Sequence, residues 1–174
     1  MKKIIALLCA LLLLSVSFAS AGAGSLVEFR DVLRLSGSVP DGYGFTLTSQ
    51  TDLSLEGSFV SADPAAPVLA VYIAFNESYA GTESLKNLGS EGEDIIKQGF
   101  LEENSVSFDS IDTASSDRLL VVREAGGLFL DFYTIRRGYE IELTLRPAIG
   151  QVLSEEQIAL WRDCLSSLSI QPLS

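Results

Sequence analysis

Residues 119–146 constrain the fold most, because they form a pattern of strands that fold back on one another. Arg137-Gly138 has the composition of a two-residue hairpin turn, which would place Arg136 opposite Tyr139. That register leaves one face largely apolar, through the pairs Thr134–Ile141, Phe132–Leu143 and Leu130–Leu145. A slip of one residue would invert both faces, so this agreement favours the register. With a further strand predicted at 119–122 and a turn at 125–127, the segment is an antiparallel meander.

The rest of the chain alternates between strand and helix patterns, which indicates an α+β fold. A turn is predicted at 39–44, followed by strands at 45–49, 52–61 and 68–76, the last two separated by a turn at 63–67. Over residues 82–103 the apolar period lengthens to that of a helix, with Thr82 as N-cap and glycines that could break it near residues 89–92. Its apolar stripe is expected to contain Leu85, Leu88, Gly92, Ile95, Ile96, Gly99 and Phe100.

A second helix is predicted at 155–168, where Ser154 and Gln157 form a capping box. Its packing face would carry Ile158, Trp161, Leu165 and Leu168, with Cys164 beside it. We therefore expect an antiparallel sheet covered by a long central helix and by a C-terminal helix.

The first 21 residues are predicted to be a cleavable secretory signal of the bacterial type. Two lysines follow Met1, residues 4–14 are apolar, and Ala19-Ser20-Ala21 supplies a small-residue cleavage site before Gly22. The apolar run is shorter than the ~20 residues that cross a bilayer, so we expect no membrane span after cleavage. Residues 22–174 would then form one exported domain, in the periplasm, the cell envelope or outside the cell.

The mature domain would be strongly acidic. Removing the signal takes the formal net charge from −11 to −13. Such a surface repels nucleic-acid phosphates and anionic lipid headgroups, which argues against both as partners. It is compatible with cationic partners, although solubility alone also explains it.

Histidine and cysteine contents exclude several chemistries. The sequence has no histidine, which removes Ser-His-Asp and Cys-His catalysis and His-ligated zinc or haem. Cys9 falls within the signal but does not fit a lipoprotein signal, because Leu8 precedes it and the apolar run continues beyond it. Cys164 therefore stands alone in the mature chain, and an intrachain disulfide is not expected. No cofactor is expected.

The polar face of the predicted hairpin is the best candidate site. The register brings together Asp131, Tyr133, Glu140, Glu142 and Arg146. Two carboxylates beside a phenol could bind a polar ligand or perform general acid–base chemistry. An ordinary amphipathic face, partly covered by a helix and with Arg146 paired to the carboxylates, explains the same pattern.

Two further groups of acidic residues occur in the sequence. Asp109, Asp112 and Asp117 lie in a serine-rich connection, residues 107–118, and are weak candidates for calcium because their spacing matches no calcium-loop pattern. Glu91, Glu93 and Asp94 are better explained by a helix that restarts after Gly89. We therefore predict no metal site.

Two motifs give the chain a family resemblance. They are Val39-Pro40-Asp41-Gly42-Tyr43, a proline followed by glycine and an aromatic residue, and the tail Leu165-Ser166-Ser167-Leu168-Ser169-Ile170 of the last helix. With the order of elements over residues 39–170, they resemble PsbP-like and DcrB-like exported domains, although Tyr43 stands where tryptophan is more usual. The resemblance implies an antiparallel sheet with helices on both faces, an α/β/α sandwich. It also implies accessory rather than enzymatic roles, and it transfers no site residues.

Together these patterns predict a non-enzymatic exported or envelope-associated accessory protein that binds an unknown protein or small molecule. The first alternative is a hydrolase or lyase that uses Asp131, Glu140 and Glu142. It requires a concave site and a carboxyl group whose pKa is raised by burial. The second alternative is a calcium-stabilised module.

Overall fold

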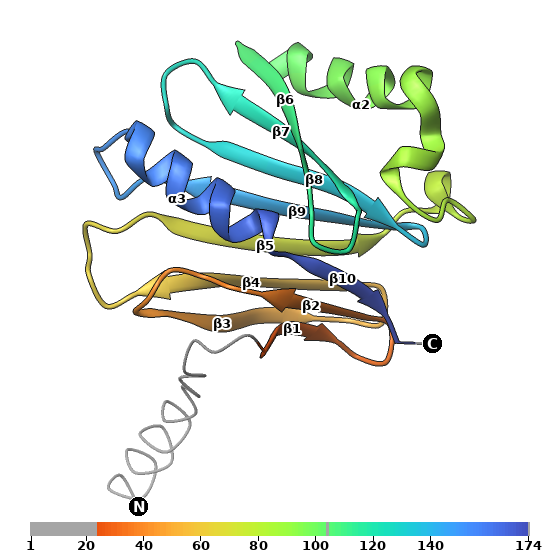
Figure 1. The fold of residues 1–174 in the computed structure, drawn as a ribbon, viewed down its shortest axis with the longest axis horizontal. Helices are drawn as coiled ribbons and strands as arrows, with labels where there is room; N and C mark the ends of the chain where they lie inside the picture. The colour runs from red at the N-terminus through yellow and green to blue at the C-terminus, as the bar shows by residue number, and fades with distance from the viewer. Residues whose placement is uncertain (1–23, 104, 174) are drawn as a thin grey trace, which may run out of the picture.

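The computed structural model describes residues 24–103 and 105–173, which fold into two antiparallel sheets and two α-helices (Figure 1). The larger sheet has seven strands in the order β3-β4-β5-β9-β8-β7-β6, and the smaller has three in the order β1-β2-β10. This establishes the predicted α+β class. The predicted secretory signal, residues 1–21, lies outside the described residues.

The elements follow one another along the chain with short connections. The strands are β1 (Gly24–Phe29), β2 (Leu33–Gly37), β3 (Tyr43–Gln50), β4 (Ser54–Ser61), β5 (Val68–Phe75), β6 (Val106–Asp112), β7 (Arg118–Glu124), β8 (Leu130–Arg136), β9 (Tyr139–Arg146) and β10 (Ser169–Pro172). The helices are the 3-10 turns η1 (Glu77–Tyr79) and η2 (Leu85–Leu88) and the α-helices α2 (Gly89–Glu103) and α3 (Glu155–Ser166).

The β8–β9 hairpin has the predicted register. Arg136 pairs with Tyr139 across a turn in which Arg137 and Gly138 both have positive φ, as a two-residue hairpin turn requires. Phe132 pairs with Leu143 and both are buried, so the apolar face is directed into the protein as expected. Strand β5 adds to the other side of β9, and β7 to the other side of β8.

One face of the large sheet packs against α3 and the small sheet. The shared core contains Phe29 and Leu35 from the small sheet, Trp161 from α3, and Phe132 and Leu143 from the large sheet. Helix α3 begins at the predicted capping box, in which the Ser154 hydroxyl accepts from the Gln157 backbone N–H and the Gln157 side-chain oxygen accepts from the Ser154 backbone N–H. The helix ends at Ser166, so Leu168 packs into the core from the segment that follows it.

The opposite face packs against α2 and η2 through a second, smaller core. This core contains Leu85, Ile96, Leu120, Val122, Tyr133 and Ile135. The predicted helix over residues 82–103 is divided where Gly89 adopts φ +67°, a conformation that favours glycine. The prediction of Thr82 as N-cap is wrong, because helical structure begins only at Leu85. Ile95, expected on the packing stripe, is 72% exposed.

Two parts of the sheets differ from the sequence prediction. The small sheet was not predicted, although β10 joins the C-terminal segment to β2 near the N-terminus. The first half of the stretch expected as a connection at 107–118 belongs to strand β6, which pairs with β7 along its whole length. As an edge strand, β6 has no fully buried side chain, and its serine and aspartate residues gave it the composition of a loop.

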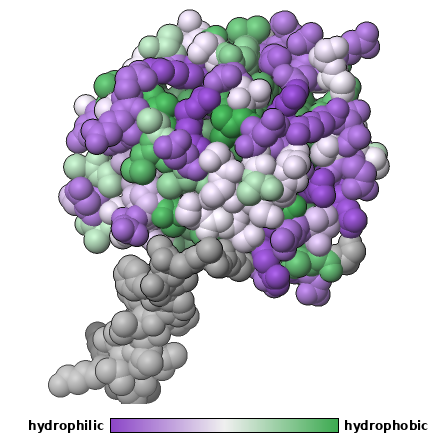
Figure 2. All heavy atoms as spheres, viewed as in Figure 1, coloured by the Kyte–Doolittle hydropathy of each residue, from purple (hydrophilic) through white to green (hydrophobic). Residues whose placement is uncertain are grey.

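The side of the molecule formed by α3 and the small sheet is mainly covered by hydrophilic and intermediate residues, with hydrophobic ones scattered among them (Figure 2). Within the described ranges, no helix is sufficiently long and apolar to cross a membrane.

Candidate functional site

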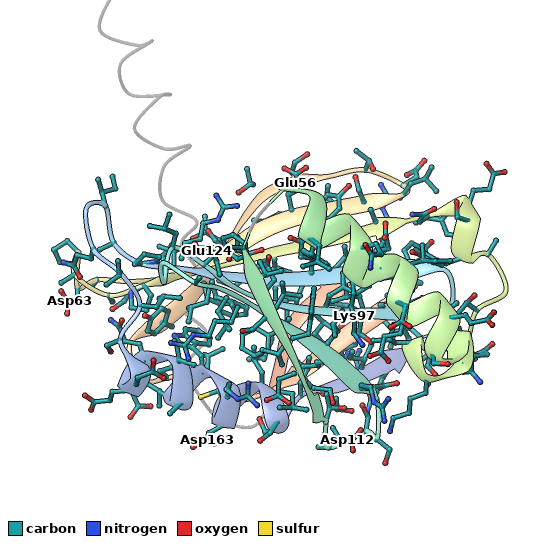
Figure 3. All side chains as sticks on the ribbon, turned by 90° about the horizontal axis from the view of Figure 1, so that it is seen from above. Glu56, Asp63, Lys97, Asp112, Glu124 and Asp163 are labelled. Atoms are coloured by element: carbon teal, nitrogen blue, oxygen red, sulfur yellow. The ribbon has the colours of Figure 1, made fainter. Side chains whose placement is uncertain are left out.

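The predicted polar residues lie on the face of the large sheet that carries α2. Figure 3 shows α2, with Lys97 labelled, on one side of this sheet and α3, with Asp163 labelled, on the other. Helix α2 packs over β6, β7 and β8 through the second core and leaves the part of the face formed by β9, β5 and β4 uncovered. Tyr72 of β5, opposite Glu142, is accordingly 40% exposed.

A cleft of about 460 Å³ follows the boundary between the covered and uncovered parts of this face. Its floor is formed by β8 and β9, its wall by α2, and one further side by the end of η1. We call it the α2 cleft, and it is lined by Tyr79, Ile95, Ile96, Gly99, Phe100, Tyr133, Glu140 and Glu142. Its size falls within the range of small-molecule sites.

A hydrogen-bonded chain fixes one carboxylate of the cleft. The Tyr133 hydroxyl donates to Glu140 Oε1 at 2.6 Å, and Asn76 Nδ2 donates to Glu140 Oε2 at 3.0 Å. Burial, and then the adjacent Glu140 carboxylate, raise the pKa of the Tyr133 phenol far above its ordinary value. Tyr133 therefore remains protonated and acts as a donor, and both oxygens of Glu140 have partners.

The second carboxylate, Glu142, is less constrained. Thr144 Oγ1 donates to Glu142 Oε1 at 3.2 Å. Thr144 also interacts with Asp131, which it faces across the hairpin. One hydroxyl hydrogen serves one acceptor at a time, so these two carboxyl groups compete for the same donor.

Asp131 lies at the buried end of this group and is 5% exposed. Its Oδ1 has no hydrogen-bond partner among the described residues. Burial raises the pKa of Asp131 to about 6, the Thr144 hydroxyl and Arg146 oppose the shift, and the Glu142 charge adds to it. Asp131 is not among the residues that line the α2 cleft.

The five predicted site residues therefore share one sheet face, but the structure does not bring all of them into one cavity. Tyr133, Glu140 and Glu142 line the cleft, Asp131 is buried beside it, and the Arg146 side chain is exposed. Sequence reasoning missed Asn76, Tyr79 and the cleft wall of α2. The helical period placed the wall residues between 95 and 100 on a packing face, and nothing in the local sequence showed that Gly99 would leave space there.

The three candidate calcium ligands are separated. Asp109 pairs with Arg162 of α3, and Asp112 pairs with Lys86 of η2, on the opposite side of the sheet. The strand period of two explains this separation, because residues three apart in a strand point to opposite faces. Asp117 is buried and receives hydrogen bonds from Ser115 and Arg136. No group of three or more potential metal ligands occurs among the residues described.

A second cleft, of about 380 Å³, lies between α3 and strands β6–β8. Its charged side chains are already paired, Arg123 with Glu155 and Arg162 with Asp109. This neutralisation makes it a weaker candidate for a ligand site than the α2 cleft.

No family model matches the chain, and no curated protein sequence matches it significantly. The function is therefore argued from the geometry of the site.

Proposed function

We propose that the chain is a non-enzymatic exported binding protein whose ligand occupies the α2 cleft. The observation that carries this proposal is the composition of the cleft, in which aromatic and aliphatic side chains surround two carboxylates. Concave sites with a largely apolar lining and a few convergent polar groups are characteristic of ligand binding.

The protonation and hydrogen bonding of the cleft favour binding over catalysis. Tyr133 is held as a donor, and both oxygens of Glu140 are engaged, so neither group is poised to accept a proton or attack a substrate. The sequence contains no histidine that could act as a base. Of the two carboxylates lining the cleft, Glu142 is the less engaged, with one described donor, Thr144, against two on Glu140.

A carboxylate-dependent hydrolase or lyase is the second candidate function. One observation favours it: burial raises the pKa of Asp131 to about 6, close to the operating range of a general acid, and the neighbouring Glu142 charge adds to that shift. We prefer binding because Asp131 lies outside the lining of the cleft.

The proposal includes export and membership of the PsbP-like and DcrB-like domains. The order of elements, with helices on both faces of an antiparallel sheet, supports the resemblance. The accessory roles implied by that resemblance agree with a protein that binds without turnover.

The two candidate functions are separated by assaying residues 22–174 with chromogenic ester, phosphoester, peptide and glycoside substrates. We expect no turnover above that of the Glu142→Gln and Asp131→Asn variants. Turnover that disappears in either variant would establish the enzymatic alternative and reject the binding proposal.

Export is tested by expressing the full chain in a bacterial host and measuring the mass of the mature product. We expect the loss of residues 1–21 and recovery of the product outside the cytoplasm. An unprocessed product that remains in the cytoplasm contradicts this part of the proposal.

A further inference from the structure

From the charge and shape of the α2 cleft, we infer that it binds an alkylammonium group, with Glu142 receiving the ammonium and the wall of α2 holding the alkyl chain. The inference rests on the proposed binding function and adds the chemical class of the ligand. The group could be carried by a free aliphatic amine or by a lysine side chain, and the two sources share this chemistry.

The charge of the cleft has no internal counterpart. Glu140 and Glu142 line it, and its described lining contains no lysine or arginine. Neither glutamate belongs to an ion pair among the described residues, whereas Glu93 pairs with Lys97 and Asp117 with Arg136. Two carboxylates in a partly desolvated cleft repel each other, and a bound cation relieves that repulsion.

The aromatic residues of the cleft add a second attraction for cations. Phe100 and Tyr133 pack edge to face, with ring centroids 6.1 Å apart and an interplanar angle of 79°. With Tyr79, which interacts with the Tyr133 hydroxyl, they place three π systems around the carboxylates. A cation near such ring faces is attracted by the ring quadrupole, and more strongly when water is excluded.

The wall of α2 provides the apolar part of the site. Ile95 is 72% exposed at the cleft, and a Cβ added at Gly99 would meet no atom within 4 Å. An extended alkyl chain can therefore lie along α2 between Ile95 and Phe100. A bare metal ion would leave this apolar surface in water and would lack the six or more oxygen ligands that calcium takes.

The arrangement of free acceptor oxygens in the cleft favours an ammonium over a guanidinium group. Both oxygens of Glu140 already accept hydrogen bonds, whereas Glu142 accepts one, at Oε1, which makes Glu142 the more open acceptor. A compact ammonium needs one such point of contact, whereas the planar fork of a guanidinium is best matched by two free oxygens of one carboxylate.

The inference is tested by titrating residues 22–174 and following backbone amide NMR signals of residues 95–100 and 140–142. The probes are pentylammonium, 1,5-diaminopentane and Nα-acetyl-lysine methylamide, with 1-pentanol and pentanoate as neutral and anionic counterparts. We expect saturable shifts of these signals with the cations, and affinities at least about tenfold higher than for pentanol or pentanoate. Tighter binding of 1,5-diaminopentane indicates a free amine as the source, and tighter binding of the lysine derivative indicates a peptide.

Three variants locate the site. Glu142→Gln removes the charge, and Gly99→Leu fills the cleft from a helical position with open space around it. We expect each to weaken cation binding at least about tenfold. Glu156→Gln, an equal change of charge at an exposed position in the first turn of α3, should change the affinity less than about twofold. Circular dichroism of each variant confirms that the fold is retained.

Two results would overturn the inference. In the first, pentanol or pentanoate shifts the cleft signals as strongly as the cations and Gly99→Leu abolishes the effect. The α2 cleft is then a binding site, so the proposed function stands while the ligand class is wrong. In the second, the cations leave the cleft signals unshifted or bind Glu142→Gln and wild type equally. The ammonium site is then rejected, and the turnover assay alone decides the proposed function.

Discussion

Asp131 carries a buried carboxyl group on the sheet face that also carries α2. Its pKa is raised to about 6, mainly by burial, whereas an aspartate in the unfolded chain titrates near 4. Between these two values the folded protein binds the proton more tightly than the unfolded chain. The stabilisation from this proton is therefore fully present below the unfolded pKa and is lost as the pH rises through about 6.

Replacing Asp131 with asparagine should remove this pH dependence. From pH 4 to pH 7.5 the wild-type protein should lose roughly 2–3 kcal/mol of unfolding free energy through Asp131, and Asp131→Asn should lack that contribution. Urea unfolding of both proteins at several pH values measures the difference between their unfolding free energies. The other carboxyl groups contribute equally to both proteins, so their contributions cancel in this difference. A difference that stays constant over this range would show that Asp131 titrates normally.

Thr134 and Thr144 lie on adjacent strands of the hairpin but differ in their hydrogen bonding. The Thr134 hydroxyl is buried in the main core and has no partner among the described residues, while the Thr144 hydroxyl donates to Glu142. A buried hydroxyl without a partner costs about 1–3 kcal/mol relative to water. The hairpin register could be predicted from the sequence, but this difference could not, because the register fixes which residues are adjacent and not whether a side-chain hydroxyl reaches an acceptor.

Thr134→Val should therefore stabilise the protein by about 1 kcal/mol, because it removes an unpaired polar group from an apolar site. Thr144→Val is the matched control and should destabilise it by about 1–2 kcal/mol, because Glu142 and Asp131 lose their shared donor. Thermal unfolding at pH 7.5 gives both values. If both variants shift the midpoint in the same direction, the assignment of partners is incorrect.

Among the elements, helix α2 shows where sequence patterns are reliable and where they are not. Its existence follows from the apolar period of residues 82–103, and its late start follows from Gly89, which breaks the helix at a positive φ. The exposure of Ile95 could not be predicted, because Ile95 lies on the side of α2 that lines the cleft, beside the part of the sheet that the helix does not cover. The period of a sequence shows which residues share a face, but not how far the neighbouring surface extends.

Two glycines of α2 should respond in opposite ways to alanine. Gly99→Ala should stabilise the protein by up to about 1 kcal/mol, because the position is helical and its Cβ would enter open space. Gly89→Ala should destabilise it by about 1–3 kcal/mol, since its φ of +67° and ψ of −176° strain any residue with a Cβ, even though space is free. Urea unfolding of both variants measures the two effects. Equal changes would show that backbone conformation at Gly89 does not govern the break.

At the scale of the whole molecule, the small sheet is the part that local patterns could not reveal. Strands β1, β2 and β10 are short, and β10 comes from the opposite end of the chain to its partner β2. The predicted core of the hairpin indicated that some element must cover its apolar face. It could not indicate that a second sheet shares that task with α3, because the pairing joins segments with no common local pattern.

The small sheet has no core of its own, so it should unfold together with the large sheet. Ile170 of β10, Trp161 of α3 and Phe132 of β8 all belong to one continuous cluster. We expect urea transitions followed by Trp161 fluorescence and by far-ultraviolet circular dichroism to coincide.

Ile170→Ala should lower the unfolding free energy by about 2–5 kcal/mol and shift both transitions equally, since it empties a site in that shared core. Leu160→Ala, which changes a half-exposed position on α3, should cost less than about 1 kcal/mol. A fluorescence transition that precedes the circular dichroism transition in Ile170→Ala would show instead that α3 and the small sheet form a separate folding unit.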